Sequence, residues 1–103
     1  SSLVAYGEIV QSKKNQAVLC RVIVNPRERR KGIGKKFVAD VMEWVFDEKK
    51  MYKITLNALG NNFPACKCYL SLGFRIIGVK RNYRWVSNQW RDLVVMEKLS
   101  AQA

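Results

Sequence analysis

Histidine is absent from the 103 residues of this chain. It is the commonest general base, the usual partner of a nucleophilic serine or cysteine, and a frequent zinc ligand. Chemistry in this protein must therefore rely on tyrosine, carboxylates, backbone amides and positive charge. Cysteine is scarce as well, with Cys20, Cys66 and Cys68 alone. Even with Cys20, and without any histidine, Cys66 and Cys68 cannot complete a set of four cysteine and histidine ligands, so we predict no metal site.

Two further absences concern location. The odd number of cysteines shows no disulfide spacing, which favours reduced thiols and a cytoplasmic protein. No apolar run approaches the roughly 20 residues that a membrane-spanning helix requires. We therefore expect no membrane partner.

Acidic residues are few: 8 aspartates and glutamates stand against 19 lysines and arginines, which gives a net charge of +11. Such an excess favours an anionic partner, which could be a nucleic acid, a membrane surface or a phosphorylated ligand. Much of it falls within residues 27–36, which hold basic side chains around Gly32 and Gly34. Without these two glycines, the segment would be interpreted as a solvated basic loop.

The apolar pattern predicts one α/β (α+β) domain with the order β-β-α-β-α-β-β. The expected strands are 3–11, 17–24, 53–58, 74–79 and 93–99, and the expected helices are 32–50 and 64–72. A helix between two strands usually makes a right-handed crossover, so 17–24 and 53–58 should form the central parallel pair of a mixed sheet. Ligands of such sheets bind beyond the carboxyl ends of the strands. We interpret residues 80–92 as a polar, aromatic connection.

The segment Arg29-Arg30-Lys31-Gly32-Ile33-Gly34 lies between the second expected strand and the first helix. Glycines let a ligand approach the backbone closely, and amides at a helix start suit a pyrophosphate. The flanking arginines and lysines add charge for further phosphates. The segment is not a Walker loop, because no Gly-Lys-Ser/Thr follows, and it lacks the third glycine of the dinucleotide fingerprint.

A second motif, Asn62-x-x-Ala65-x-x-x-Tyr69-x-x-x-Gly73-Phe74, follows about one βα unit later. With the glycine segment before it, the chain resembles the GNAT N-acetyltransferase superfamily over roughly residues 17–99. The tail Gln89-Trp90-Arg91-Asp92-x-x-x-Met96 is similar to the branch that contains ribosomal-protein N-terminal and spermidine acetyltransferases. The resemblance implies a single acyl-CoA-binding domain over residues 1–103, with acetyl-CoA as co-substrate.

The resemblance also implies roles for particular residues. Backbone groups of Val22, Ile23 and Val24 would pair with the pantetheine arm, although their side chains suit a strand in the core equally well. The pyrophosphate would be bound by Arg29, Arg30, Lys31, Gly32, Ile33, Gly34 and Lys35. Asn62 would contact pantetheine or orient the site; a turn residue or helix N-cap is its alternative role.

Tyr69 is the expected catalytic residue, because the tyrosine at this position of the family protonates the leaving CoA thiolate. A phenol of pKa about 10 is protonated at neutral pH and can act in this way. Its alternative role is a half-buried aromatic residue on a helix. The implied reaction transfers acetyl to a primary amine by direct attack, and a backbone N–H of residues 22–24 would stabilise the oxyanion. We expect no acyl-cysteine intermediate.

The sequence differs from several members of the family in lacking an obvious general base. Asn57 and Gln16 occupy positions at which several relatives have glutamate, and neither can accept a proton. Glu8 and Asp92 are the remaining candidates. An α-amine of pKa about 7.7–8.0 is neutral far more often at pH 7 than a lysine amine of pKa about 10.4. This favours a peptide N-terminus or another weakly basic amine as acceptor.

An additional strand, two helices and a further strand of the family have no counterpart before Leu3. We therefore expect a shortened chain, a partner chain that completes the sheet, or a degenerate enzyme, and a homo-oligomer formed through the open sheet edge. The main alternative function is a catalytically weak CoA-binding or regulatory module that needs a partner chain. Binding of nucleic acid through Tyr83, Trp85 and Trp90 is the least favoured interpretation.

Overall fold

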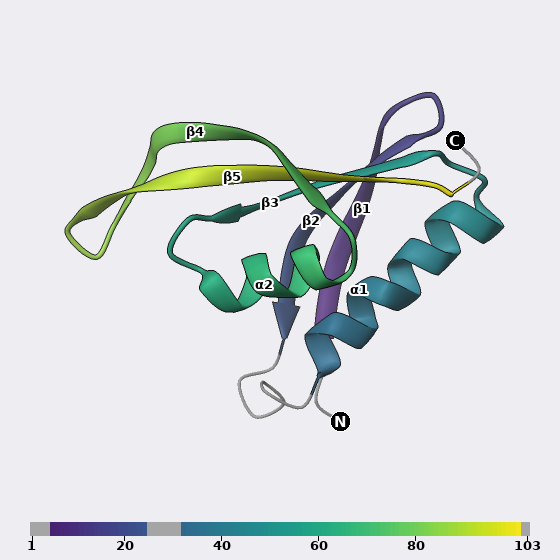
Figure 1. Ribbon diagram of the computed structural model, residues 1–103, viewed down its shortest axis with the longest axis horizontal. Coiled ribbons are helices and arrows are strands. Elements are labelled where there is room, and N and C mark those ends of the chain that lie inside the picture. Colours follow the sequence, from purple (N-terminus) through teal and green to yellow (C-terminus); the bar gives the residue numbers. More distant parts are fainter. Residues whose placement is uncertain (1–4, 25–31, 102–103) are drawn as a thin grey trace.

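The computed structural model describes residues 5–24 and 32–101, which form a five-stranded mixed sheet with two α-helices (Figure 1). The elements are β1 (Ala5–Lys13), β2 (Gln16–Val24), α1 (Ile33–Glu43), the π-helical turn η2 (Trp44–Glu48), β3 (Lys53–Leu59), α2 (Phe63–Ser71), β4 (Arg75–Val86) and β5 (Gln89–Leu99). This confirms the predicted order and the α+β class. The first predicted helix is α1 together with η2.

The sheet has the strand order β1-β2-β3-β5-β4. β2 and β3 are parallel neighbours, as predicted, but they pair only from Gln16↔Lys53 to Leu19↔Leu56. After Leu56, β3 continues along β5, whereas β2 continues along β1 to Val24. The two parallel strands therefore diverge toward their carboxyl ends (Figure 1).

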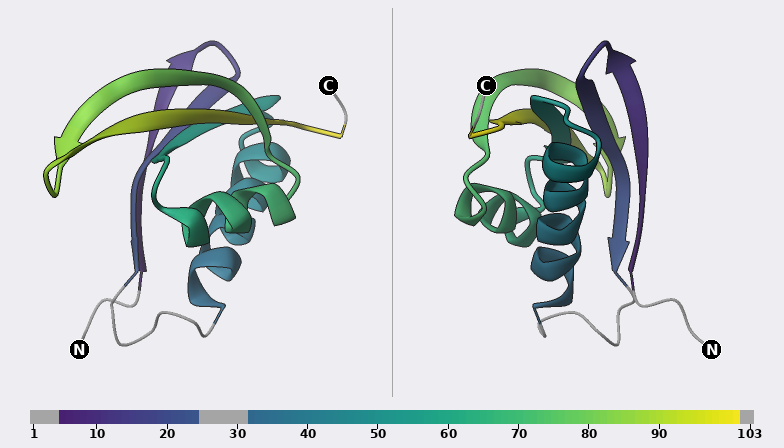
Figure 2. Two further views of the ribbon diagram at one scale, coloured as in Figure 1. Left: turned by 60° about the vertical axis from the view of Figure 1, so that its left-hand side comes forward. Right: turned by 90° about the vertical axis from the view of Figure 1, so that its right-hand side faces the viewer.

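Both helices lie on the same face of the twisted sheet, with α2 beneath the β4–β5 hairpin (Figure 2). Val38 of α1 and Val45 of η2 pack there with Ile54, Leu56 and Met96, and each of these side chains is at most 1% exposed. This core fixes α1 against the central strands. The first turn of α1 consequently lies at the end of the molecule where β2 ends (Figure 1).

The interpretation of residues 80–92 as a connection was wrong, because β4 and β5 extend through them as one long hairpin. Ser87 and Asn88, with φ of 53° and 62°, form its two-residue turn, and such turns favour residues that tolerate positive φ. Trp85 and Trp90 pair across the strands, with ring centroids 5.5 Å apart in an edge-to-face arrangement. Almost all of β4 is exposed on both faces, so no alternation of buried and exposed residues marks it as a strand.

Candidate functional site

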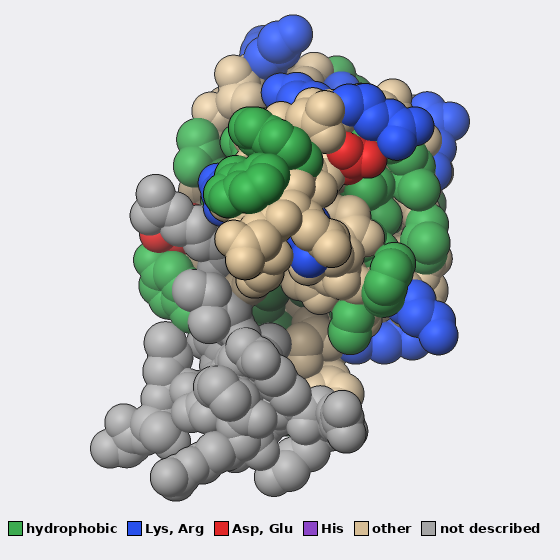
Figure 3. All heavy atoms as spheres, turned by 90° about the vertical axis from the view of Figure 1, so that its left-hand side faces the viewer, with side chains coloured by type: hydrophobic (Ala, Val, Ile, Leu, Met, Phe, Trp, Pro, Cys, Tyr) green, Lys and Arg blue, Asp and Glu red, His purple; other side chains and the backbone are tan. Residues whose placement is uncertain are grey.

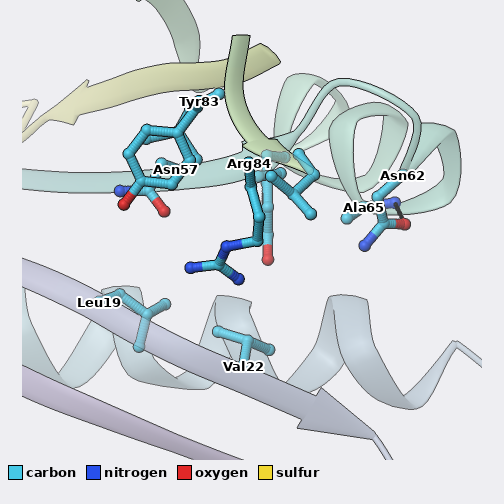
Figure 4. Close-up of a pocket in the computed structure, with 11 residues that line it drawn as sticks. Leu19, Val22, Asn57, Asn62, Ala65, Tyr83 and Arg84 are labelled. Atoms are coloured by element: carbon cyan, nitrogen blue, oxygen red, sulfur yellow. Dashed lines mark hydrogen bonds between the residues drawn. The ribbon is translucent and has the colours of Figure 1, made fainter. Parts of the chain in front are cut away.

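A cavity of about 330 Å³ opens where β2 and β3 diverge. It is lined by residues of β2, β3, α2, β4 and β5 and of the turn before α2: Leu19, Val22, Asn57, Ala58, Leu59, Asn62, Ala65, Tyr69, Tyr83, Arg84 and Leu93. Leu19 and Val22 lie on one side, and Arg84 reaches from β4 into the space between them and β3 (Figure 4). The cavity is thus at the carboxyl ends of the parallel strands, where α/β sheets commonly bind ligands.

The edge of β2 beside this cavity is open. Within the part of the chain that the structure describes, β2 beyond Leu19 pairs with β1 alone. Val22 lines the cavity from this edge, and the strand backbone continues through Ile23 to Val24. An unpaired strand edge can bind an extended, amide-containing ligand as an added strand.

The start of α1 has the geometry of an anion site. Gly32 has φ 74° and ψ 9°, in the left-handed region that favours glycine, and its carbonyl accepts a 3.0 Å hydrogen bond from the N–H of Lys36. A Cβ at Gly32 would meet no atom within 4 Å, so a side chain would not clash with its surroundings. Glycine is favoured here because of the positive φ. Of the remaining predicted pyrophosphate ligands, Arg29, Arg30 and Lys31 lie outside the described residues.

The first amides of α1 have no acceptor among the described residues. None of the described side chains caps the helix, and its first turn contains no acid. None of the described carbonyls accepts a hydrogen bond from the N–H of Ile33, Gly34 or Lys35. These groups and the positive end of the helix dipole can therefore act together on an anion.

Asn62 begins α2 as its N-cap. Its Oδ1 accepts a 3.3 Å hydrogen bond from the N–H of Ala65, drawn as a dashed line in Figure 4. Pro64 occupies the first turn, where its missing N–H costs no helical hydrogen bond. The capping role considered from the sequence is confirmed, and Asn62 also lines the cavity. Its Nδ2 can donate to a ligand while Oδ1 caps the helix.

Tyr69 projects from α2 into the lining of the cavity and is only 6% exposed. Its ring packs against that of Phe74, with centroids 6.1 Å apart, and its carbonyl accepts a hydrogen bond from the N–H of Phe74. Burial, and to a smaller extent Cys68 and Cys66, raises the pKa of Tyr69 from 10.0 to about 12. The hydroxyl is therefore protonated at neutral pH and suits a proton donor, not a base.

This raised pKa leads to a prediction for alkaline stability. The folded state holds the Tyr69 proton more tightly than the unfolded chain, so the associated stability is fully present below pH 10 and is lost between pH 10 and about pH 12. Tyr69→Phe should consequently lose less stability than the wild type over that window. Denaturant unfolding of both proteins at pH 9, 10 and 11 checks this, and equal losses would contradict it.

Cys66 and Cys68 precede the tyrosine on α2. Burial raises the pKa of both thiols, and for Cys68 the positive charge of Lys35 partly opposes the rise. Both thiols are therefore protonated at neutral pH and poor nucleophiles. α1 also lies in contact with α2, the helix that carries Tyr69.

The expected candidates for a general base do not line the cavity. Asp92 is engaged on β5, where its carboxylate pairs with Arg81 at 3.1 Å and accepts a hydrogen bond from the N–H of Asn82. Glu8 accepts a hydrogen bond from the hydroxyl of Tyr6 on β1. None of the described residues that line the cavity is acidic.

Arg84 and Tyr83 belong to the cavity but were missed in the sequence. Both come from the hairpin that was interpreted as a connection. The signal that could have found them is the concentration of strand-favouring aromatic residues, such as Trp85 and Trp90, on both sides of Ser87-Asn88. Arg84 thus brings a positive charge to the cavity, and the sequence had not predicted this arginine as a site residue.

Two further observations concern the described residues. No group of three or more histidine, cysteine, aspartate or glutamate side chains gathers there to hold a metal ion. No helix in the described part of the chain is both long and apolar enough to cross a membrane.

Comparisons with known proteins agree with this geometry. The model of the acetyltransferase (GNAT) family matches residues 1–74. The ribosomal protein bS18-alanine N-acetyltransferase of Escherichia coli K12 is 25% identical over 88 residues, which are 85% of this chain and 59% of that protein. The crystal structure of the E. coli ribosomal-protein-S18-alanine N-acetyltransferase has a TM-score of 0.85 at 23% identity, covering 93% of this chain and 61% of the other.

A dodecameric spermidine N-acetyltransferase from Vibrio cholerae has a TM-score of 0.87 at 19% identity, covering 98% of this chain and 60% of the other. The chain thus spans about three-fifths of the length of these relatives. They represent the ribosomal-protein and spermidine branch that the sequence resembles. Because the family match covers most of the chain, including the glycine segment and α2, the protein belongs to the acetyltransferase (GNAT) family.

Proposed function

We propose that this protein is an acetyl-CoA-dependent N-acetyltransferase that acts on a primary amine. One observation carries the proposal: an open strand edge and a buried tyrosine lie at one cavity, and α1, whose first amides have no acceptor among the described residues, begins at the end of the molecule where β2 ends (Figure 1). They suit three parts of acyl-CoA, namely the extended amide arm, the pyrophosphate and the sulfur that leaves.

The residues that would hold acetyl-CoA follow from this match. Backbone groups of residues 22–24 would pair with the pantetheine arm, and the Nδ2 of Asn62 would donate to it. The amides of residues 32–35 would bind the pyrophosphate, with added charge from residues 29–31. A thioester held along β2 would then lie beside Tyr69.

The proposed reaction is a direct transfer. A neutral amine attacks the thioester carbonyl, and a backbone N–H of residues 22–24 stabilises the developing oxyanion. As the carbon–sulfur bond breaks, the Tyr69 hydroxyl donates its proton to the sulfur. The protonated thiols of Cys66 and Cys68 support a route without an acyl-enzyme intermediate.

The acceptor is proposed to be a weakly basic amine such as a peptide N-terminus. No described cavity residue can remove a proton from a strongly basic ammonium group. An α-amine is neutral at pH 7 roughly a few-hundred-fold more often than a lysine amine, because their pKa values differ by about 2.5 units.

Assembly into a homo-oligomer is also proposed. β1 and β4 are the outer strands of the sheet, and apolar side chains on them are about half exposed, including Val10, Ile76 and Ile77. Open strand edges with apolar side chains favour association between copies. Light scattering at two protein concentrations would show the assembly.

Calorimetric titration with CoA tests the cofactor site. Lys35 lies in the first turn of α1 and Lys49 caps the far end of the helix after η2, so Lys35→Glu and Lys49→Glu change the net charge equally at opposite ends. We expect Lys35→Glu to weaken CoA binding roughly 10-fold and Lys49→Glu less than twofold. Glutamate in a first helical turn favours the helix, so unfolding would not explain the loss.

Turnover separates this proposal from a second candidate, a CoA-binding module that needs a partner chain for activity. The absence of a carboxylate among the described cavity residues favours that candidate. An enzyme should release CoA from acetyl-CoA when amines from a panel of α-amines are added. Tight CoA binding without acetylation of any amine would support the module, and equal effects of the two lysine substitutions would contradict the proposed pyrophosphate site.

A further inference from the structure

Two arginines of the β4–β5 hairpin have carboxylate partners. Arg75 approaches Glu97 at 3.6 Å, and Arg81 approaches Asp92 at 3.1 Å. These pairs use both acids that β5 contains, and β4 contains none. Any further arginine on the hairpin is therefore left without a carboxylate from these two strands.

Arg84 and Arg91 are in this position, and they stand directly opposite each other in the antiparallel pair. Opposed side chains share one face of a sheet, and like charges placed so are destabilising. Neither has a carboxylate partner among the described residues, and the buried Nε of Arg91 has no hydrogen-bond partner there at all. The guanidinium of Arg84 lies 5.6 Å from the centroid of the Tyr83 ring, a contact that does not occupy its N–H groups.

This unpaired charge lies on the side of the cavity. Arg84 reaches into the cavity (Figure 4), and Arg91, as its cross-strand partner, belongs to the same face of the hairpin. Seen from the hairpin end, lysine and arginine side chains cover far more of the described surface than acidic ones (Figure 3). The cavity therefore contains the positive charge of Arg84, and none of the described residues that line it is acidic.

We propose that Arg84 and Arg91 form the anion-recognising part of the acceptor subsite, and that the acceptor is an amine with a carboxylate a few bonds from the amino group. This inference rests on the proposed acetyltransferase function. A carboxylate would satisfy the free guanidinium donors and screen the repulsion between the two arginines. A polyamine, in contrast, would bring further positive charge to both.

Paired acceptors test the inference. Peptides that begin with Asp and otherwise identical peptides that begin with Asn differ in one charge, and spermidine provides a polycation. With acetyl-CoA, we expect kcat/KM to be roughly 10-fold higher for the Asp peptide, and lowest for spermidine. In Arg84→Gln the ratio should fall to about 1, whereas Arg81→Gln, on the same strand but paired with Asp92, should keep the wild-type ratio.

The outcomes are distinguishable from failure of the proposed function. Acetylation of Asp and Asn peptides at equal rates would overturn the anion subsite and leave the acetyltransferase intact. If no amine is acetylated, titration with the α-methylamides of N-acetylaspartate and N-acetylasparagine decides, because these two compounds differ only in the side-chain carboxylate; the side-chain Nε–H signals of Arg84 and Arg91 are followed by NMR. Shifts with the aspartate compound alone support the subsite, and shifts with both or neither overturn it.

Stability provides an independent readout. Because Arg84 and Arg91 repel each other, Arg91→Gln should raise the thermal unfolding midpoint, whereas Arg81→Gln, which breaks an ion pair, should not. A lower midpoint for Arg91→Gln would show that the arginine stabilises the hairpin and is not held there for a ligand.

Discussion

Replacement of Tyr69 by phenylalanine is expected to lower kcat by roughly 100-fold or more while the Kd for acetyl-CoA changes less than about twofold. The substitution removes only the hydroxyl, and the ring that packs against Phe74 is kept. Without a proton donor, the leaving thiolate has to depart unprotonated. Single-turnover kinetics together with calorimetric CoA titration separate the chemical step from binding.

Tyr52→Phe is a matched control for this experiment. Tyr52 follows η2, and its hydroxyl accepts a hydrogen bond from the side chain of Gln16 outside the cavity lining. The control should keep kcat within about twofold, since surface substitutions rarely affect a distant reaction. An unchanged kcat in Tyr69→Phe, or an equal loss in both variants, would remove Tyr69 from the mechanism.

Replacement of Asn57 by glutamate is expected to raise the rate with a lysine-type amine roughly 100-fold at pH 7, the lower limit for a positioned general base. Asn57 is exposed, lines the cavity and lies one residue beyond the last β2–β3 pair. A carboxylate there could remove the proton from an ammonium group. An acceptor with an α-amine should gain less, because more of it is already neutral.

The pH dependence distinguishes a base from a general electrostatic effect. With a lysine-type acceptor, the wild-type rate should rise about tenfold per pH unit up to the pKa of the amine, because the neutral fraction rises in that way. Asn57→Glu should flatten this slope, whereas Asn57→Gln should retain it. A slope that is equally steep in all three proteins would show that a carboxylate at this position is no base.

Much of the fold could be predicted because its central elements are marked by strong local patterns. The spacing of apolar residues such as Val41 and Val45 indicated the first helix, and the crossover rule made β2 and β3 parallel. Asn62 and Gly73 marked the start and end of α2, where Asn62 caps the helix and Gly73 has φ 93°.

The outer half of the β4–β5 hairpin could not be predicted in the same way. Its strands are exposed on both faces, so they lack the alternation by which a half-buried strand is normally identified. As a result Tyr83 and Arg84 were not placed in the cavity. The partner of Arg91 across the strands depends on register, which is fixed by the Ser87–Asn88 turn and not by local composition.

The candidate site was predicted in outline for a different reason. The glycine segment and the Asn62–Tyr69 spacing are short motifs whose chemistry is local, and the structure brings Asn62 and Tyr69 to one cavity. The roles of the site residues stay predictions until the substitutions are made. The general base could not be inferred at all, because it depends on which distant carboxylate folding brings to the cavity.

The early parting of β2 and β3 has a mechanical consequence. Among the described residues, four strand pairs and the backbone hydrogen bond from the N–H of Tyr52 to the carbonyl of Asn15 join the β1–β2 ribbon to the rest of the sheet, and no strand pairing joins the two parts beyond Leu19. An extended ligand bound between the diverging ends of β2 and β3 would contact both parts of the sheet. It would therefore restrict the motion of the β1–β2 ribbon relative to β3, β4 and β5. Substrate capture and rigidity of the protein would then be one and the same event.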